Sequence, residues 1–216
     1  MPGENPQHKG TGLIPLVAGL KALPGVRDEL PPHLHRYLDE PVLPSGWYPE
    51  RDYVELLETF AARTDAATTG GNVWAFIGRA AAQWDLAGDR ESVAPPSRTG
   101  SSGLYRQFVK ADPTDAPSFF LRAKKLWQLY RDTGALEVFR RGEGPVVVLR
   151  LSGYQFPFRG LVEVQTAYFL EFARLSGLKM DGRAVPPSKN DATDWEFTLE
   201  DPSPRVLDWV ANLVEA

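Results

Sequence analysis

Residues 136–151 read LEVFRRGEGPVVVLRL and contain the strongest hairpin signal in the chain. Two extended runs, residues 136–141 and 145–151, flank Gly142-Glu143-Gly144, and glycines at such a junction favour a turn between antiparallel strands. The run Val146-Val147-Val148-Leu149 does not alternate polar and apolar residues, which indicates a strand that is buried on both faces. The sequence therefore predicts a sheet with this run in a central strand.

The chain after the hairpin predicts a helix, two more strands and a last helix. Residues 158–176 predict a helix that ends at Gly177, and residues 178–185 predict a third strand. Residues 193–199 place Trp195, Phe197 and Leu199 on one side and polar residues on the other, as in a half-buried strand. A last helix begins at Ser203 and Pro204. This order favours a four-stranded, mostly antiparallel sheet packed with helices on one side.

The chain before the hairpin predicts helices. Tyr53, Leu56, Leu57 and Phe60 follow Pro49 at helical spacing, which puts four apolar side chains on one face. The other helices are expected at residues 13–23, 26–38 with Pro31 and Pro32 opening a new helix, 73–88, 104–110 and 115–134, and a loop is expected at 88–103. The fold class is thus α+β: a flexible tail over residues 1–12, then a single domain over 13–216, with a helical part at 13–134 and a sheet-containing part at 135–216.

Composition limits the classes of function. The chain has 216 residues, of which 43% are hydrophobic and 11% aromatic, so it can bury a core. Its net charge of -4 comes from 28 acidic and 24 basic residues. That balance repels a phosphate backbone, so no nucleic-acid partner is expected.

The absence of cysteine from the sequence excludes disulfides, thiolate metal sites and a cysteine nucleophile. Residues 1–6 lack the basic and apolar runs of a signal peptide, and no segment approaches the roughly 20 apolar residues that span a bilayer. We therefore expect a cytoplasmic protein without a membrane span.

No hydrolase elbow, dinucleotide turn or phosphate loop occurs in the sequence. His33 and His35 are the only neighbouring histidines, and on a helix two residues two apart face different sides. A metal site would need more ligands, with Asp39 and Glu40 as the nearest candidates, so a helix start at the surface is favoured. The acidic pairs Asp85 with Asp89 and Asp191 with Asp194 are expected to be solvated rather than catalytic. We therefore predict no catalytic residues, no metal and no cofactor.

Aromatic side chains offer two candidate binding surfaces, although most are expected in the core. Tyr154, Phe156 and Phe158 lie in a connection after the buried strand, where large apolar side chains are often used in contacts. They are the candidates for a partner or ligand surface. Another set, on one predicted helix, would face a pocket between that helix and the sheet: Phe119, Trp127 and Tyr130.

Several short motifs together resemble a known layout. They are Gly46-Trp47-Tyr48-Pro49 at a helix start, Ile77-Gly78-Arg79 in the next helix, and Trp127, Tyr130 and Gly134 before the hairpin, followed by a helix and the Trp195 strand. Over residues 43–199 this layout resembles a family of uncharacterised proteins known mainly from myxobacteria. That family is itself similar to the sensory fold shared by four-vinyl-reductase-like and haem-NO-binding domains.

The resemblance implies a bacterial ligand-sensing or protein-interaction module, often dimeric, and this inference rests on the fold. The chain departs from those sensory domains because it has no cysteine and no well-placed axial histidine, so haem or metal binding does not carry over.

Three functions remain open from the sequence. The first is a non-catalytic regulatory or scaffolding protein that acts through a protein partner or as a homo-oligomer. The second is a small-molecule-sensing domain that takes a small apolar ligand in a pocket between sheet and helices. The third is an enzyme with an unrecognised site, for which His33 or His35 would have to join carboxylates in a concave cluster.

Overall fold

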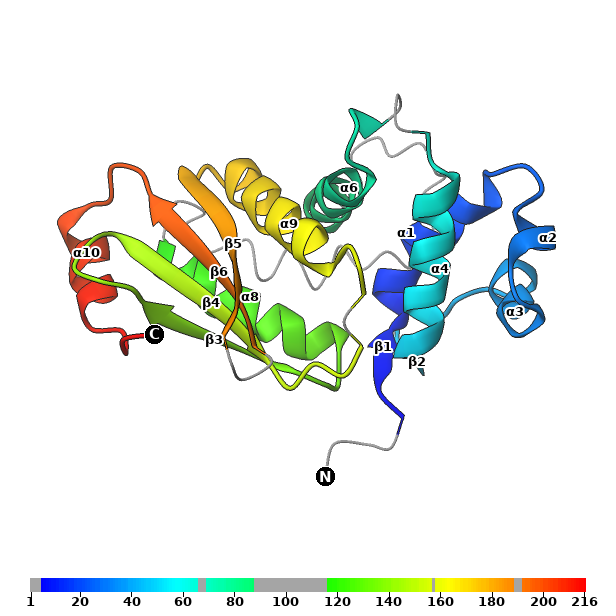
Figure 1. Cartoon of the computed structure of the whole chain (residues 1–216), viewed down its shortest axis with the longest axis horizontal. Coiled ribbons are helices and arrows are strands. Elements are labelled where there is room, and N and C mark those ends of the chain that lie inside the picture. Colours follow the sequence, from blue (N-terminus) through cyan, green and yellow to red (C-terminus); the bar gives the residue numbers. More distant parts are fainter. Residues whose placement is uncertain (1–4, 66–68, 88–115, 157, 189–191) are drawn as a thin grey trace.

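The computed structural model of the chain describes residues 5–65, 69–87, 116–156, 158–188 and 192–216. A four-stranded antiparallel sheet occupies one side of the molecule (Figure 1), in the strand order β3-β4-β6-β5. Its strands are β3 (Ala135–Arg140), β4 (Val146–Ser152), β5 (Met180–Ser188) and β6 (Ala192–Leu199). The predicted α+β class, with a four-stranded antiparallel sheet packed against helices, is confirmed.

The hairpin at residues 136–151 forms as the sequence predicts. In its register Val138 pairs with Leu149, and β4 pairs with β6 on its other edge. Val147, Val148 and Leu149 are all 0% exposed. The run without alternation is therefore a central strand buried on both faces, because both faces are covered.

Two helices cover the face of the sheet that carries Trp195 and Phe197. They are α8 (Ala116–Tyr130) and α9 (Leu161–Leu175). Phe120 of α8 and Phe169 of α9 both contact the Phe197 ring, with centroids 5.9 and 5.8 Å away. The last helix, α10 (Pro204–Ala211), stacks Trp209 on Phe120 at 6.0 Å. These aromatic contacts form the core between the helices and the sheet.

Arginines cover the polar side of β6. Asp194 and Glu196 point away from the core, as the alternation predicts, yet both are buried. Arg150 donates two hydrogen bonds of 2.8 Å to Asp194, and Arg141 and Arg183 donate to Glu196. The strand predicted to be half-buried is therefore buried on both sides, and both of its buried carboxylates are paired with arginines.

Helix α6 (Val73–Ala87) packs against α9, away from the sheet (Figure 1). The Asn72 side chain accepts a hydrogen bond of 2.9 Å from the Ala75 amide, so it caps α6. The two helices approach closely at Gly78, where an added Cβ would lie 2.2 Å from the Val164 carbonyl oxygen. A glycine is required there because any side chain would separate the helices.

The remaining elements form a second side of the molecule (Figure 1). They are β1 (Gln7–Lys9), α1 (Gly10–Lys21), α2 (Val26–Glu29), the short 3-10 helix η1 (Pro32–Leu34), α3 (His35–Asp39), β2 (Trp47–Pro49) and α4 (Glu50–Arg63). Pro31 and Pro32 divide the helix expected at residues 26–38 into shorter pieces, because proline cannot continue a helix.

The start of the chain differs from the predicted tail. Residues 7–12 form β1 and the first turn of α1, and β1 pairs with β2 in an antiparallel ladder. The Glu50 amide also donates a hydrogen bond of 2.8 Å to the Pro6 carbonyl. The ladder provides partners for a backbone that a polar sequence by itself would leave in water.

The loop predicted at residues 88–103 and the helix at 104–110 lie outside the described residues. In the part of the chain that the structure describes, no helix has both the length and the apolar character needed to cross a bilayer.

Candidate functional site

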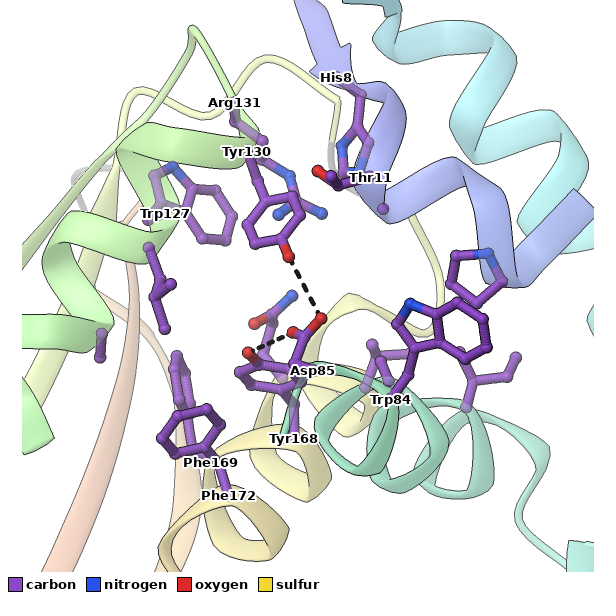
Figure 2. Close-up of a pocket in the computed structure, with 18 of the residues that line it drawn as sticks. His8, Thr11, Trp84, Asp85, Trp127, Tyr130, Arg131, Tyr168, Phe169 and Phe172 are labelled. Atoms are coloured by element: carbon purple, nitrogen blue, oxygen red, sulfur yellow. Dashed lines mark hydrogen bonds between the residues drawn. The ribbon is translucent and has the colours of Figure 1, made fainter. Parts of the chain in front are cut away.

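A cavity of about 100 Å³ lies where the two sides of the molecule meet (Figure 2). Its walls come from α1, α6, α8 and α9, with single side chains from β1 and α4. Phe119, Trp127 and Tyr130, which the sequence assigns to a pocket, all line it. Their use in binding a ligand stays a prediction.

Helical spacing explains why the lining is mostly aromatic. On α8 the residues Phe119, Trp127 and Tyr130 share one face with Ala123 and Leu126, and on α9 Tyr168, Phe169 and Phe172 do the same. Smaller residues of α1 and α6 complete the wall, among them Thr11, Gly12, Ile77 and Ala81. The cavity is therefore apolar apart from a few polar groups.

One of these polar groups is the carboxylate of Asp85, on α6. It accepts hydrogen bonds from the Tyr168 hydroxyl at 2.7 Å and the Tyr130 hydroxyl at 3.2 Å (Figure 2). No lysine, arginine or histidine of the described residues lies within ion-pairing distance of it. Burial among the aromatic rings raises the pKa of Asp85 to about 7, and the bond from Tyr168 opposes that rise only in part.

The position of Asp85 corrects a sequence-based expectation. The sequence predicts a solvated Asp85, yet the side chain faces the cavity and keeps only part of its surface accessible. The signal was in the spacing, since Asp85 follows Ala81 by four residues and Ile77 by eight and so shares their face. Its proposed partner Asp89 lies outside the described residues, as does Asp191, while Asp194 belongs to the arginine-covered sheet face.

A second polar group lies beside the cavity and is centred on Glu50, the first residue of α4. Glu50 is 0% exposed, and its carboxylate accepts hydrogen bonds from Arg131 Nε at 3.2 Å and the Tyr154 hydroxyl at 2.5 Å. His8 Nδ1 lies 3.3 Å from the other carboxylate oxygen. We call Glu50, His8, Arg131 and Tyr154 the Glu50 cluster. It joins β1 and α4 to the ends of α8 and β4.

Arg131 determines the charge of the Glu50 cluster. Burial acts to raise the pKa of Glu50, but the charge of Arg131 and the hydrogen bonds from His8 and Tyr154 outweigh it and lower that pKa to about 2. Burial also lowers the pKa of His8, so this imidazole is neutral near pH 7. Because a carboxylate only accepts, the His8 proton is on Nδ1, and Nε2 is the acceptor that faces Gly12.

The His8 ring is held by contacts with Glu50, Tyr53 and α1. It stacks on Tyr53 with centroids 3.9 Å apart and an interplanar angle of 6°. A Cβ at Gly12 would lie 2.3 Å from Nε2, so the glycine allows α1 to pass over the ring. Sequence analysis missed His8 and Glu50, because a lone histidine in a polar stretch and an acid in a first helical turn are usually solvated.

The three residues predicted as a contact surface lie after β4. Tyr154 is half-buried and belongs to the Glu50 cluster, with its ring edge-on to Trp127 at 5.3 Å. Phe158 is buried beside Trp74, with centroids 6.0 Å apart, and Phe156 is half-buried. Two of the three rings thus have partners inside the molecule, and a role for this connection in binding a partner stays a prediction.

The neighbouring histidines lie apart from the cavity. His33 Nε2 lies 3.1 Å from Glu55, and His35 Nε2 contacts the Leu30 carbonyl at 3.0 Å. Among the residues that the structure describes, no three His, Asp or Glu side chains are arranged to hold a metal ion.

Comparisons with known proteins identify the fold. No family model matches the chain, and no curated protein matches it. Among solved structures, a variant of the Tt H-NOX domain matches with a TM-score of 0.57 at 12% identity, over 90% of this chain and 96% of that chain. An oxygen-binding H-NOX domain related to soluble guanylate cyclases matches with a TM-score of 0.53 at 11% identity, over the same shares.

A third match comes from work on haem distortion in the H-NOX family, with a TM-score of 0.55 at 10% identity over 90% and 96% of the two chains. The predicted similarity to the haem-NO-binding sensory fold is therefore confirmed, and identities this low show the fold alone.

Proposed function

We propose that this chain is a small-molecule-sensing domain whose ligand binds in the cavity between α1, α6, α8 and α9. The observation that carries the proposal is an aromatic cavity with one inward carboxylate at the junction of the two sides of the molecule. Pockets of this kind, apolar with a few placed polar groups, are typical of ligand sites. The shared fold supports the proposal, because one of the H-NOX domains it matches binds oxygen.

Because the cavity lies between the two sides of the molecule, a bound ligand can change how they are arranged. Thr11 and Gly12 belong to α1, whereas Phe119 and Phe172 belong to the helices that pack on the sheet. Suppose that the two sides can adopt two relative arrangements and that the ligand binds one arrangement more tightly. Binding then shifts the equilibrium towards that arrangement, and such a shift is what sensing requires. We propose that the signal passes on through a protein contact, with a protein partner or a second copy of the chain, and that the domain itself is non-catalytic.

The described residues do not fit haem, the group associated with the H-NOX matches. The cavity of about 100 Å³ is far smaller than the roughly 300–1,000 Å³ of pockets for larger ligands. Of the three histidines in the sequence, His8 alone lines it, and that ring is held by Glu50 and Tyr53. Residues 88–115, outside the described part, contain no histidine or cysteine.

The ligand is instead expected to be small. An apolar cavity of about 150 Å³ in another protein admits benzene. A cavity of about 100 Å³ with a partly open mouth therefore suits a molecule with a single ring or a short chain.

Three single-ring probes of similar size test the proposal: benzyl alcohol, benzylamine and benzoate, which are neutral, cationic and anionic near pH 7. We expect at least one probe to raise the melting temperature of the protein, because a ligand that binds the folded state stabilises it. Ala81→Leu fills the cavity and should abolish the shift. Ala80→Leu, on the exposed side of the same helix, should keep it.

If no probe raises the melting temperature of the unmodified protein, or if the Ala81→Leu variant responds as the Ala80→Leu variant does, the proposed function is wrong.

A further inference from the structure

We propose that the cavity selects a small organic cation, such as a protonated amine, which pairs with the carboxylate of Asp85 inside a cage of aromatic rings. This inference rests on the proposed function and names the class of its ligand.

The geometry around Asp85 leaves room for another donor. An ionised carboxylate has about four lone-pair positions, and Tyr130 and Tyr168 each donate to one oxygen. Both donors are phenols, which supply a proton to the bond but no positive charge. Within the described residues no cationic side chain pairs with this carboxylate, so a bound ammonium group would be its counter-ion.

The charges of the side chains around the cavity also favour a cationic ligand. Arg131 also lines the cavity, but its charge is opposed by Glu50 at 3.2 Å, and its guanidinium lies 4.4 Å from the centre of the Trp127 ring. His8 is neutral because burial lowers its pKa. The Glu50 cluster is therefore balanced, whereas no cationic side chain in the described part of the chain balances Asp85. An uncompensated charge in an apolar site favours a ligand of opposite sign.

Aromatic rings line the cavity that the carboxylate faces (Figure 2). Trp84 neighbours Asp85 on α6, and Trp127, Tyr130, Tyr168 and Phe172 stand on the facing helices. The faces of such rings attract cations, with about 0.5–2 kcal/mol for each well-placed pair, and they do not attract anions. A carboxylate within an aromatic cage therefore favours an amine over a neutral molecule of the same shape.

The proton affinity of Asp85 adds a pH dependence. Among the described residues, the titratable or charged groups facing it are Tyr130 on α8, Tyr168 on α9, Tyr53 on α4, and His8 and Arg131 beyond them. Burial raises the pKa of Asp85 to about 7, so the carboxylate is mostly protonated at pH 6 and mostly ionised at pH 8. Benzylamine stays cationic over this range, so its affinity should rise about tenfold from pH 6 to pH 8.

Calorimetric titration of the full chain with the three probes tests the inference at pH 8. We expect benzylamine to bind at least about tenfold more tightly than benzyl alcohol, and benzoate to bind most weakly. In the Asp85→Asn variant the preference for benzylamine should disappear while benzyl alcohol still binds. Glu163→Gln removes an exposed carboxylate from α9 and should leave the preference unchanged.

The outcomes separate the two proposals. If no probe binds, both the sensing function and the choice of ligand class fail. If benzyl alcohol binds as tightly as benzylamine at pH 8, the cavity remains a ligand site but the cation inference is overturned. A preference that survives in Asp85→Asn overturns the role of Asp85. Should that variant not fold, the unmodified protein decides, because an affinity for benzylamine that is equal at pH 6 and pH 8 contradicts the inference.

Discussion

Two carboxylates near the cavity, those of Glu50 and Asp85, have pKa values that are shifted in opposite directions. Glu50 has the Arg131 guanidinium and two further hydrogen-bond donors, so its charged form is favoured despite burial. Asp85 has two phenol donors and no cation among the described side chains, so burial dominates and its neutral form is favoured. The opposite pKa shifts of the two carboxylates thus depend mainly on Arg131, which pairs with Glu50.

Replacing Asp85 by asparagine should stabilise the protein at neutral and higher pH. Because the folded state raises the pKa of Asp85 from 3.8 to about 7, the stability that its neutral form contributes is present below pH 3.8 and is lost as pH rises to about 7. We expect Asp85→Asn to raise the free energy of unfolding by up to about 4 kcal/mol at pH 8 and by little at pH 4. Urea titrations at both pH values measure this, and equal gains at both would contradict it.

Replacing Glu50 by glutamine should destabilise the protein strongly. Arg131 would lose its counter-ion while remaining buried, and breaking such a pair costs about 3–5 kcal/mol. Glu55→Gln on the same helix removes a carboxylate that contacts the exposed Arg51 and His33 side chains, and should cost about 1 kcal/mol or less. Urea unfolding at pH 7 compares them, and similar midpoints would show that the Glu50 cluster adds no stability.

The stabilisation that the Glu50 carboxylate contributes should decrease as the pH falls. Because the folded state lowers the pKa of Glu50 from 4.5 to about 2, its stabilisation is present above pH 4.5 and is lost as pH falls towards 2. The full effect is about 3 kcal/mol. The difference in unfolding free energy between the unmodified protein and Glu50→Gln should therefore shrink from pH 5 to pH 2. A constant difference would mean that Glu50 titrates normally.

At the level of elements, the contact between α6 and α9 depends on Gly78. Alanine in a helix normally adds about 1 kcal/mol relative to glycine. Here the added Cβ would lie 2.2 Å from the Val164 carbonyl, and such overpacking costs about 1–3 kcal/mol. We expect Gly78→Ala to lower the melting temperature, whereas Ala80→Ser on the exposed side should change it little. A higher melting temperature for Gly78→Ala would mean that the two helices separate without cost.

Elements with local signals could be predicted from the sequence. The hairpin has its glycine turn, α4 has Pro49 before its first residue, and α6 has Asn72 as its cap. Strand β1 could not be predicted, because its three residues are ordered by β2, some forty positions later in the chain. The two prolines at positions 31 and 32 predict a new helix at this point of the chain. The division into the short elements α2, η1 and α3 depends on tertiary packing and could not be predicted.

The candidate site could be predicted only where one helix supplies it. Phe119, Trp127 and Tyr130 share a helical face, so their common position follows from spacing. The Glu50 cluster unites residues from four distant parts of the sequence, and no periodicity connects them. Asp85 lies between these cases, because its spacing from Ala81 places it on the apolar face while its polarity argues for solvent.

For the whole molecule, the Glu50 cluster predicts that both sides unfold together. Opening α4 alone would expose the cavity wall and leave Arg131 without its carboxylate. We expect hydrogen exchange, followed by mass spectrometry at rising urea, to give the same opening free energy for peptides from α4 and from β4. If α4 opens at a free energy lower by about 2 kcal/mol or more, the molecule consists of two separately stable units.

The Glu50 cluster also sets an order of events during synthesis. Glu50 leaves the ribosome 81 residues before Arg131, and Tyr154 follows later still. Until then the nascent β1, α1 and α4 have no counter-ion for a carboxylate that the finished protein buries completely. The first part of the chain should therefore stay loosely folded on the ribosome and become compact only after α8 and the hairpin have emerged.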